Sequence, residues 1–195
     1  MQNDFINNII HKKGIKLDES SLLALQEGFQ LRIVKKGDYF IREGDASQEI
    51  AIVKNGIFCA YYIEKTGVEV IKYFYPEESV LVSYYAYLTG HKSGYYMQAL
   101  EDSEIYVMKL NDFKQMVEGN YNLLYLCKKL LDEILIMKEE HATSFTRLNS
   151  LERYQQFLER YPGLEKRVKQ YQIASYLGIT PVSLSRIRRK LNLNK

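Results

Sequence analysis

The most distinctive chemistry in the sequence lies in its last quarter, where arginine and lysine concentrate. Residues 186–190 read RIRRK, so four of these five residues are cations. From Arg147 to the last residue there are 11 Lys and Arg against 3 Asp and Glu, a net of +8; the first 146 residues hold the other 16 cations and 21 acids, a net of −5. A basic end on an acidic body indicates either a solvated basic surface or an anionic partner.

The stretch IASYLGITPVSLSRIRRKL, residues 173–191, has the spacing of two short helices joined by a tight turn. Ala174 supplies the small side chain needed where the two helices approach each other, and Gly178 allows the positive φ of a sharp turn. Thr180 is a good N-cap and Pro181 suits the first position of the second helix. The apolar positions that lock the helices together are Ile173, Leu177, Ile179, Leu184 and Ile187. This combination predicts a helix-turn-helix unit.

The second predicted helix turns a polar, cationic face away from its apolar one. In helix-turn-helix units the first turn of this helix enters the major groove, while cations neutralise phosphates. Arg186 is suited to a bidentate contact with guanine, and Pro181 and Val182 to contact with a thymine methyl group. The candidate DNA-binding residues are therefore Thr180, Pro181, Val182, Ser183, Ser185, Arg186, Arg188, Arg189 and Lys190. The alternative is a basic segment that docks to an acidic protein.

The segment that precedes this unit, residues 30–109, reads as a series of short strands. Two short amphipathic helices, about 3–11 and 18–28, are expected before it. The strands are rich in β-branched and aromatic residues and are separated by glycine-containing turns. We expect strands at 31–34, 39–43, 49–53, 56–64, 69–75, 95–100 and 104–110. Many short strands at regular spacing indicate a sandwich or barrel.

One long helix is predicted to connect the strands to the basic unit. No Pro or Gly interrupts residues 121–147, which gives a helix of roughly 40 Å. Spacings of four and three typical of a coiled-coil seam predict a dimer interface at Leu123, Cys127, Leu130, Ile134, Met137 and His141. A second row, Leu124, Leu131 and Leu135, widens the apolar face, so one row could pack on the strands while the other meets a partner. A single core-facing stripe on a monomer is the alternative.

Enzymatic chemistry has no candidate residues in this sequence. The three histidines, His11, His91 and His141, are scattered with no HxH or HxxE pairing, and no nucleophile elbow, phosphate loop or dinucleotide fingerprint occurs. Cys59 and Cys127 form no disulfide framework or metal motif. We therefore expect no enzyme activity, metal or identified cofactor. No leader pattern or membrane-spanning run occurs, so a cytoplasmic location is expected.

Taken together, these features resemble the superfamily of bacterial transcription regulators typified by the cyclic-AMP receptor protein and the fumarate-nitrate regulator (Crp/Fnr). The glycine turns at Gly37, Gly44 and Gly56 match the β-roll of that superfamily, the helix from Tyr121 matches its dimerisation helix, and the tail matches its DNA-binding domain. The resemblance implies an α+β fold: a cyclic-nucleotide-binding-like β-roll of double-stranded jelly-roll type with flanking helices (1–120), a dimerisation helix (121–147) and a helix-turn-helix domain (148–195). It also implies a homodimer, double-stranded DNA with a palindromic operator, and RNA polymerase as partners.

The sequence departs from the superfamily where cyclic nucleotide would bind. A Gly-Glu pair and a later Arg hold the ribose and cyclic phosphate in the family, but the matching positions here are Val82 and Ser83, then Ser93. Without the guanidinium, a buried phosphate lacks its bidentate partner, so cyclic AMP is not the expected effector. Tyrosines nearby either fill the old pocket or line it for another small molecule. The candidate pocket residues are Ser83, Tyr84, Lys92, Ser93 and Tyr95.

The tail departs from cyclic-AMP-type regulators at two points. Val182 stands where those regulators direct an acidic residue at cytosine, so a different operator is expected. Only residues 192–195 follow Leu191, so no C-terminal wing hairpin is expected.

Overall fold

The computed structural model describes residues 2–191, with side chains from Asp4 onward. The helices are α1 (Gln2–Lys12), α2 (Glu19–Gly28), α3 (Tyr84–Thr89), α4 (Leu110–Val117), α5 (Tyr121–Arg147), α6 (Ser150–Arg160), the 3-10 turn η1 (Leu164–Lys166), α7 (Gln170–Tyr176) and α8 (Pro181–Lys190). The strands are β1 (Gln30–Val34), β2 (Tyr39–Ile41), β3 (Glu49–Asn55), β4 (Phe58–Ile63), β5 (Glu69–Tyr75), β6 (Val80–Leu81), β7 (Tyr96–Ala99) and β8 (Ser103–Lys109). The predicted α+β class is confirmed.

The strands form a β-roll of two antiparallel four-stranded sheets, ordered β1-β8-β3-β6 and β2-β7-β4-β5. Alternate residues of each strand face its interior, which is filled by Phe58, Leu81, Met97 and Ile105, each at most 1% exposed. Residues of the opposite parity face outward, yet many of these are also apolar. The sheets must therefore be covered on their outer faces as well.

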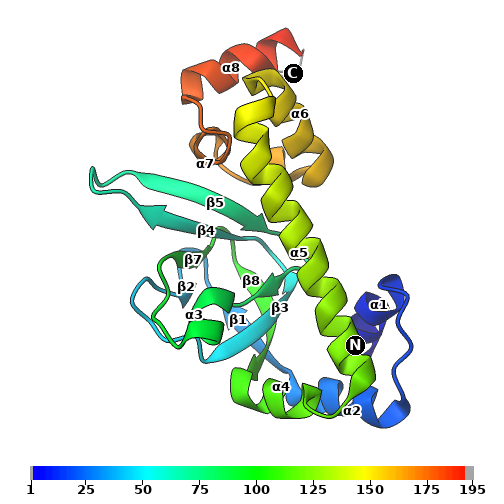
Figure 1. Cartoon of the computed structure of the whole chain (residues 1–195). Coiled ribbons are helices and arrows are strands. Elements are labelled where there is room, and N and C mark those ends of the chain that lie inside the picture. The colour runs from blue at the N-terminus through cyan, green and yellow to red at the C-terminus, as the bar shows by residue number, and fades with distance from the viewer. Residues whose placement is uncertain (1, 192–195) are drawn as a thin grey trace.

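Two groups of helices provide that cover (Figure 1). The outer face of the first sheet, including Ile50 and Tyr106, packs against α1, α2, α4 and the first half of α5. The outer face of the second sheet, including Cys59 and Phe74, packs against the C-terminal helices α6 to α8. Strands β3, β4 and β8 are apolar on both faces because helices cover the outer face and the β-roll interior covers the inner one.

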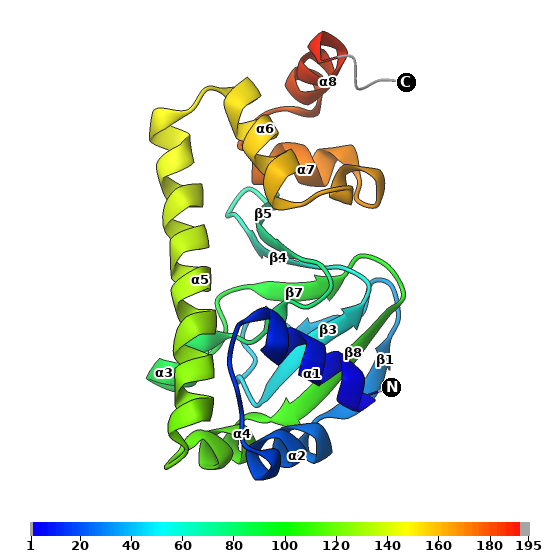
Figure 2. The same cartoon turned by 90° about the vertical axis from the view of Figure 1, so that its right-hand side faces the viewer.

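The long helix α5 spans the bounds predicted from the sequence, Tyr121–Arg147. It begins at Asn120, whose side-chain oxygen accepts a hydrogen bond from Leu123 N at 3.1 Å and whose amide donates to Ser21 Oγ. Figure 2 shows α5 running along one side of the molecule, with the β-roll beside its middle and α6 to α8 at its far end. The helix therefore connects the β-roll to the basic unit.

One stretch differs from the sequence-based expectations. The segment 82–94, for which no element was predicted, contains the helix α3, and β6 precedes it. The helix α4 begins at Leu110, with Lys109 as its cap. Residues 192–195, on which the expectation about a wing depends, lie outside the described residues. None of the described helices is both long and apolar enough to cross a bilayer.

Candidate nucleic-acid interface

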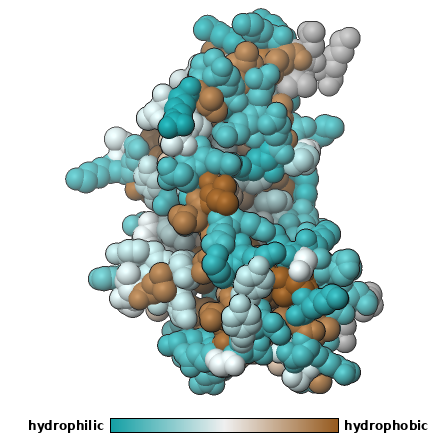
Figure 3. All heavy atoms as spheres, turned by 45° about the vertical axis from the view of Figure 1, so that its right-hand side comes forward, coloured by the Kyte–Doolittle hydropathy of each residue, from teal (hydrophilic) through white to brown (hydrophobic). Residues whose placement is uncertain are grey.

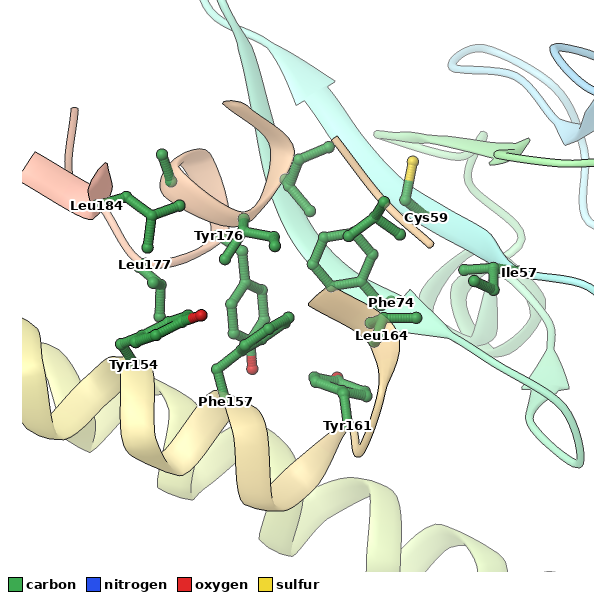
Figure 4. Close-up of a cluster of buried hydrophobic side chains, with 14 of the residues drawn as sticks. Ile57, Cys59, Phe74, Tyr154, Phe157, Tyr161, Leu164, Tyr176, Leu177 and Leu184 are labelled. Carbon is green, nitrogen blue, oxygen red and sulfur yellow. The ribbon is translucent and has the colours of Figure 1, made fainter. Parts of the chain in front are cut away.

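Helices α7 and α8 are joined by the turn that the sequence predicts. Gly178 has φ of +65°, and the Thr180 side-chain oxygen accepts a hydrogen bond from Ser183 N at 3.1 Å, with Pro181 at the first helical position. Ala174 is fully buried between the helices. Figure 4 shows Leu177 and Leu184 pointing into one cluster with Tyr154, Phe157 and other aromatic side chains. The predicted helix-turn-helix unit is therefore a packed structure, with Ile179 and Ile187 at the edge of its core.

The face of α8 that points away from this core carries most of the candidate DNA-binding side chains. Val182 at the start of the helix is 62% exposed, although a large aliphatic side chain gains nothing from contact with water. Arg186 lies one turn later and is also exposed. The other exposed candidates are Thr180, Pro181, Arg189 and Lys190. An exposed apolar residue among cations suits a groove that offers both methyl groups and phosphates.

The remaining candidates are less accessible. Ser183 and Ser185 are half-buried, and the Ser183 hydroxyl lies 2.9 Å from the Thr180 hydroxyl. Arg188 is half-buried, and its Nε is inaccessible and has no hydrogen-bond partner within the described part of the chain. The Arg188 guanidinium lies close enough to Tyr154 to act on the pKa of that phenol, which burial raises. Arg188 thus lies partly against α6, whereas the sequence placed it fully on the outer face.

The basic unit is fixed to the β-roll at the edge strand β5. The Ser175 hydroxyl of α7 accepts from Ile71 N at 3.0 Å and donates to Glu69 O at 3.1 Å, so one side chain continues the hydrogen bonding of the sheet edge. Arg167 pairs with Glu77 through both guanidinium nitrogens, at 2.6 and 3.0 Å, and also with Glu101. These contacts, which no sequence motif predicted, hold the basic unit against the β-roll.

His141 of α5 takes part in the same junction. Its ring stacks on Tyr176 of α7 at 4.3 Å between centroids and contacts Tyr73 and Phe145. Burial, followed by the nearby charges of Arg160 and Arg153, lowers the pKa of His141 to about 4, so the ring is neutral near pH 7. The sequence assigned His141 to an interface between protomers, whereas it packs within one protomer.

Leu123, the first residue of the predicted dimer seam, is likewise inside the protomer. It is 1% exposed and packs with Leu126 in the core beneath the first sheet. Cys127, Leu130, Ile134 and Met137 are half-buried. In the neighbouring row Leu124 is 57% exposed and Leu135 is 67% exposed, whereas Leu131 between them is half-buried. The two rows have the same spacing and lie one residue apart, so spacing alone does not tell which of them the β-roll covers.

Ser83 and Ser93 come together although they are ten residues apart. Both side chains are buried, and their hydroxyls lie 3.2 Å from each other. Ser93 also donates to Tyr95 O at 2.8 Å, and Tyr95 donates to Val82 O at 3.4 Å. Tyr95 and Tyr75 pack against the apolar interior of the β-roll. The other two pocket candidates make no hydrogen bond to this hydroxyl pair: Tyr84 is half-buried and Lys92 is exposed.

Neither the thiols nor the acidic groups suggest a metal or redox centre. Burial raises the pKa of Cys127 to about 11 and that of Cys59 to about 12, so both thiols are protonated near neutral pH. Among residues 2–191, no group of three or more His, Cys, Asp or Glu side chains could hold a metal ion.

Comparison with known proteins identifies the β-roll. Residues 31–120 match the family model described as the cyclic nucleotide-binding domain. No curated protein sequence matches the chain. The domain match confirms the predicted β-roll, and the solved structures below share the fold of most of the chain.

Several solved structures superpose on most of the chain at low sequence identity. FixK2 from Bradyrhizobium japonicum is 17% identical, with 85% of each chain covered and a TM-score of 0.73. The c-di-GMP-responsive regulator CLP from Xanthomonas campestris is 12% identical over 91% of this chain and 93% of its own, with a TM-score of 0.69. A protein from Eubacterium rectale assigned to the Crp/Fnr family is 14% identical over 91% and 84%, with a TM-score of 0.70. Similarity at this level shows a shared fold.

Proposed function

We propose that the protein is a homodimeric, sequence-specific DNA-binding transcription regulator that does not respond to cyclic AMP. The observation that carries this proposal is the outer face of α8. Val182 and Arg186 are exposed in its first two turns, and Arg189 and Lys190 follow. A packed helix-turn-helix core holds this face outward, which is the arrangement that presents base-reading residues and phosphate-binding cations together.

The outward row of α5 supports the homodimer. Leu124 and Leu135 are large aliphatic side chains left exposed on a helix whose other face is buried. Pairing this row with a second copy would bury both and relate the two α8 helices by a two-fold axis. Two recognition helices would then contact successive major grooves about 34 Å apart, on a palindromic site.

The buried serine pair supports independence from cyclic AMP. Ser83 and Ser93 offer hydroxyls 3.2 Å apart, but no charge, to a phosphate. A cyclic phosphate placed there would lose its water without gaining a charge-assisted partner. Phe58 and the partly buried Tyr75 and Tyr95 also occupy the interior of the β-roll.

The experiment is selection of binding sites from random duplexes, followed by titration of the selected duplex. We expect a two-fold symmetric consensus sequence, and loss of affinity in Arg186→Ala but not in Arg42→Ala, an exposed arginine on the β-roll as a matched control. Adding cyclic AMP should leave the affinity unchanged. If no sequence is enriched, while the basic unit captures an acidic protein, the unit docks to protein and the DNA proposal fails.

A further inference from the structure

An apolar cavity of about 550 Å³ lies between α5 and the outer face of the first sheet. The sheet contributes Ile50 and Ile52 of β3, and α5 contributes its inner flank, including Cys127, Leu130 and Ile134. This volume falls in the range of about 300–1,000 Å³ that small-molecule sites occupy. Figure 3 shows that hydrophobic side chains also reach the surface in separate patches on the middle and lower parts of the molecule.

Helix α1 forms a wall of this cavity, and ion pairs at its C-terminal end connect it to the sheet and to α5. Ile6, Ile9 and Ile10 line the wall. Just beyond, Lys12 pairs with Glu78 in the turn before β6, and Lys13 pairs with Glu133 of α5. The wall is therefore attached to both the sheet side and the helix side of the cavity.

Glu78 is held in an unfavourable conformation at the edge of the same cavity. Its φ is +68°, which no other non-glycine residue among those described adopts. A side chain in this region costs about 1–3 kcal/mol and persists only where surrounding contacts fix it. Its backbone N–H donates to Val53 O at 2.8 Å, and its carboxylate pairs with Lys12. These contacts maintain the conformation at the mouth of the cavity.

Lys114 is the one cation among the described residues that line the cavity, where it lies with the acids Glu78 and Glu118. Glu78 is already paired, whereas Lys114 contacts Glu118 at only 3.7 Å, the longest ion pair among the described residues. Lys114 and Glu118 are both more than half exposed. The lining is otherwise almost entirely aliphatic and aromatic, with the half-buried Tyr84 and Tyr87 among it. A carboxylate could pair with Lys114 while an aliphatic chain occupies the interior.

We propose that this cavity binds an amphipathic carboxylic acid of medium chain length, with its chain between β3 and α5 and its carboxylate at Lys114. The site is separate from the β-roll interior, where Ser83 and Ser93 meet. Leu124 and Leu131 of the neighbouring α5 row also line the cavity, so a second copy paired through that row would border the site. An occupant contacts the β-roll and α5 at once, and α5 carries His141 to the junction with α7. The site is therefore placed to act on the orientation of α8.

The test is a titration of the full chain with decanoic acid, followed by NMR of isoleucine methyl groups. Six lining residues are isoleucines, whose methyl signals respond to an occupant of the cavity: Ile6, Ile9, Ile10, Ile50, Ile52 and Ile134. We expect saturable shifts at these methyl groups, with Ile105 in the β-roll interior and Ile173 in the helix-turn-helix core unchanged. This experiment uses no DNA, so its result is independent of the proposed function.

Two variants and one comparison make the assignment specific. Ile52→Phe, which fills the cavity, should weaken decanoic acid at least tenfold, while the matched Ile63→Phe on the exposed end of β4 should not. Lys114→Met should weaken decanoic acid several-fold and leave 1-decanol unchanged, which separates recognition of the carboxylate from apolar binding. Wild-type spectral dispersion checks that each variant is folded.

Two results would overturn the proposal. One is the absence of saturable shifts at the cavity isoleucines. The other is a change in the same methyl groups on dilution without any ligand, together with a monomer–dimer change in sedimentation, because a second copy of the chain would then fill the cavity.

Discussion

Replacing Gly178 with alanine tests the junction between α5 and the turn before α8. Gly178 has φ of +65°, where an L-residue costs about 1–2 kcal/mol. A Cβ atom at this position would also lie 2.8 Å from Cε1 of Phe145 on α5, well inside van der Waals contact. Overpacking costs about 1–3 kcal/mol, and the lower end applies because the Phe145 ring is 45% exposed and can move. We expect Gly178→Ala to lower the free energy of unfolding by about 2–3 kcal/mol in total.

Gly163 is the matched control for this substitution. Its φ is +80°, it lies in the same group of C-terminal helices, and a Cβ atom there would meet nothing within 4 Å. Gly163→Ala should therefore cost only the backbone contribution of about 1–2 kcal/mol. In a Phe145→Ala background, Gly178→Ala should cost no more than Gly163→Ala, since the clash is removed.

Urea unfolding followed by circular dichroism measures all four variants. Equal costs for Gly178→Ala and Gly163→Ala in the wild-type background, with unchanged m-values, would refute the packing of Phe145 on the turn.

Three further predictions concern DNA binding, assembly and pH. Arg186→Ala should cost about 1–3 kcal/mol in DNA affinity and relax specificity at one base pair. Arg189→Ala should weaken binding to all sequences alike and lower the slope of log affinity against log salt by about 1. If both variants discriminate between base pairs equally well, the DNA-reading face of α8 is misassigned. Leu135→Glu should convert dimers to folded monomers in sedimentation, while Leu23→Glu, an exposed leucine on α2, should not; a dimeric Leu135→Glu would place the interface elsewhere. The pKa of His141 falls from 6.5 in the unfolded chain to about 4 in the folded protein. The neutral ring therefore contributes to the free energy of unfolding above pH 6.5, and this contribution is lost as the pH falls from 6.5 through 4. After allowance for solvent screening of a partly exposed ring, this contribution amounts to about 1–2 kcal/mol. When the free energy of unfolding is measured against pH, His141→Phe should remove this part of the decrease between pH 6.5 and 4. An unchanged decrease would show that the ring is solvated.

Local signals in the sequence were sufficient for the elements whose chemistry is local. Gly178 permits a positive φ, Thr180 carries an oxygen that can cap a helix, and Pro181 fits the first helical position, so the turn and the start of α8 were predictable. The uninterrupted run from Tyr121 to Arg147 likewise predicted α5 to the residue.

Contacts between distant segments could not be predicted in this way. Ser175 accepts a hydrogen bond from β5, about a hundred residues earlier, and Arg167 forms ion pairs with Glu77 and Glu101. The type of these residues does not predict which distant residue each one contacts. The choice between two heptad rows on α5 also depends on which row the β-roll covers. One signal was available: the stretch 56–63, GIFCAYYI, is apolar at both parities, which indicates a strand buried on both faces.

The most direct test of the central claim is the salt dependence of binding between the full chain and its selected duplex, measured by fluorescence anisotropy. The account predicts a steep linear fall of log affinity with log salt concentration, reflecting several phosphate contacts, and a large loss when one of the two half-sites is scrambled. Affinity that is independent of salt, or equal for the selected and the fully scrambled duplex, would contradict it.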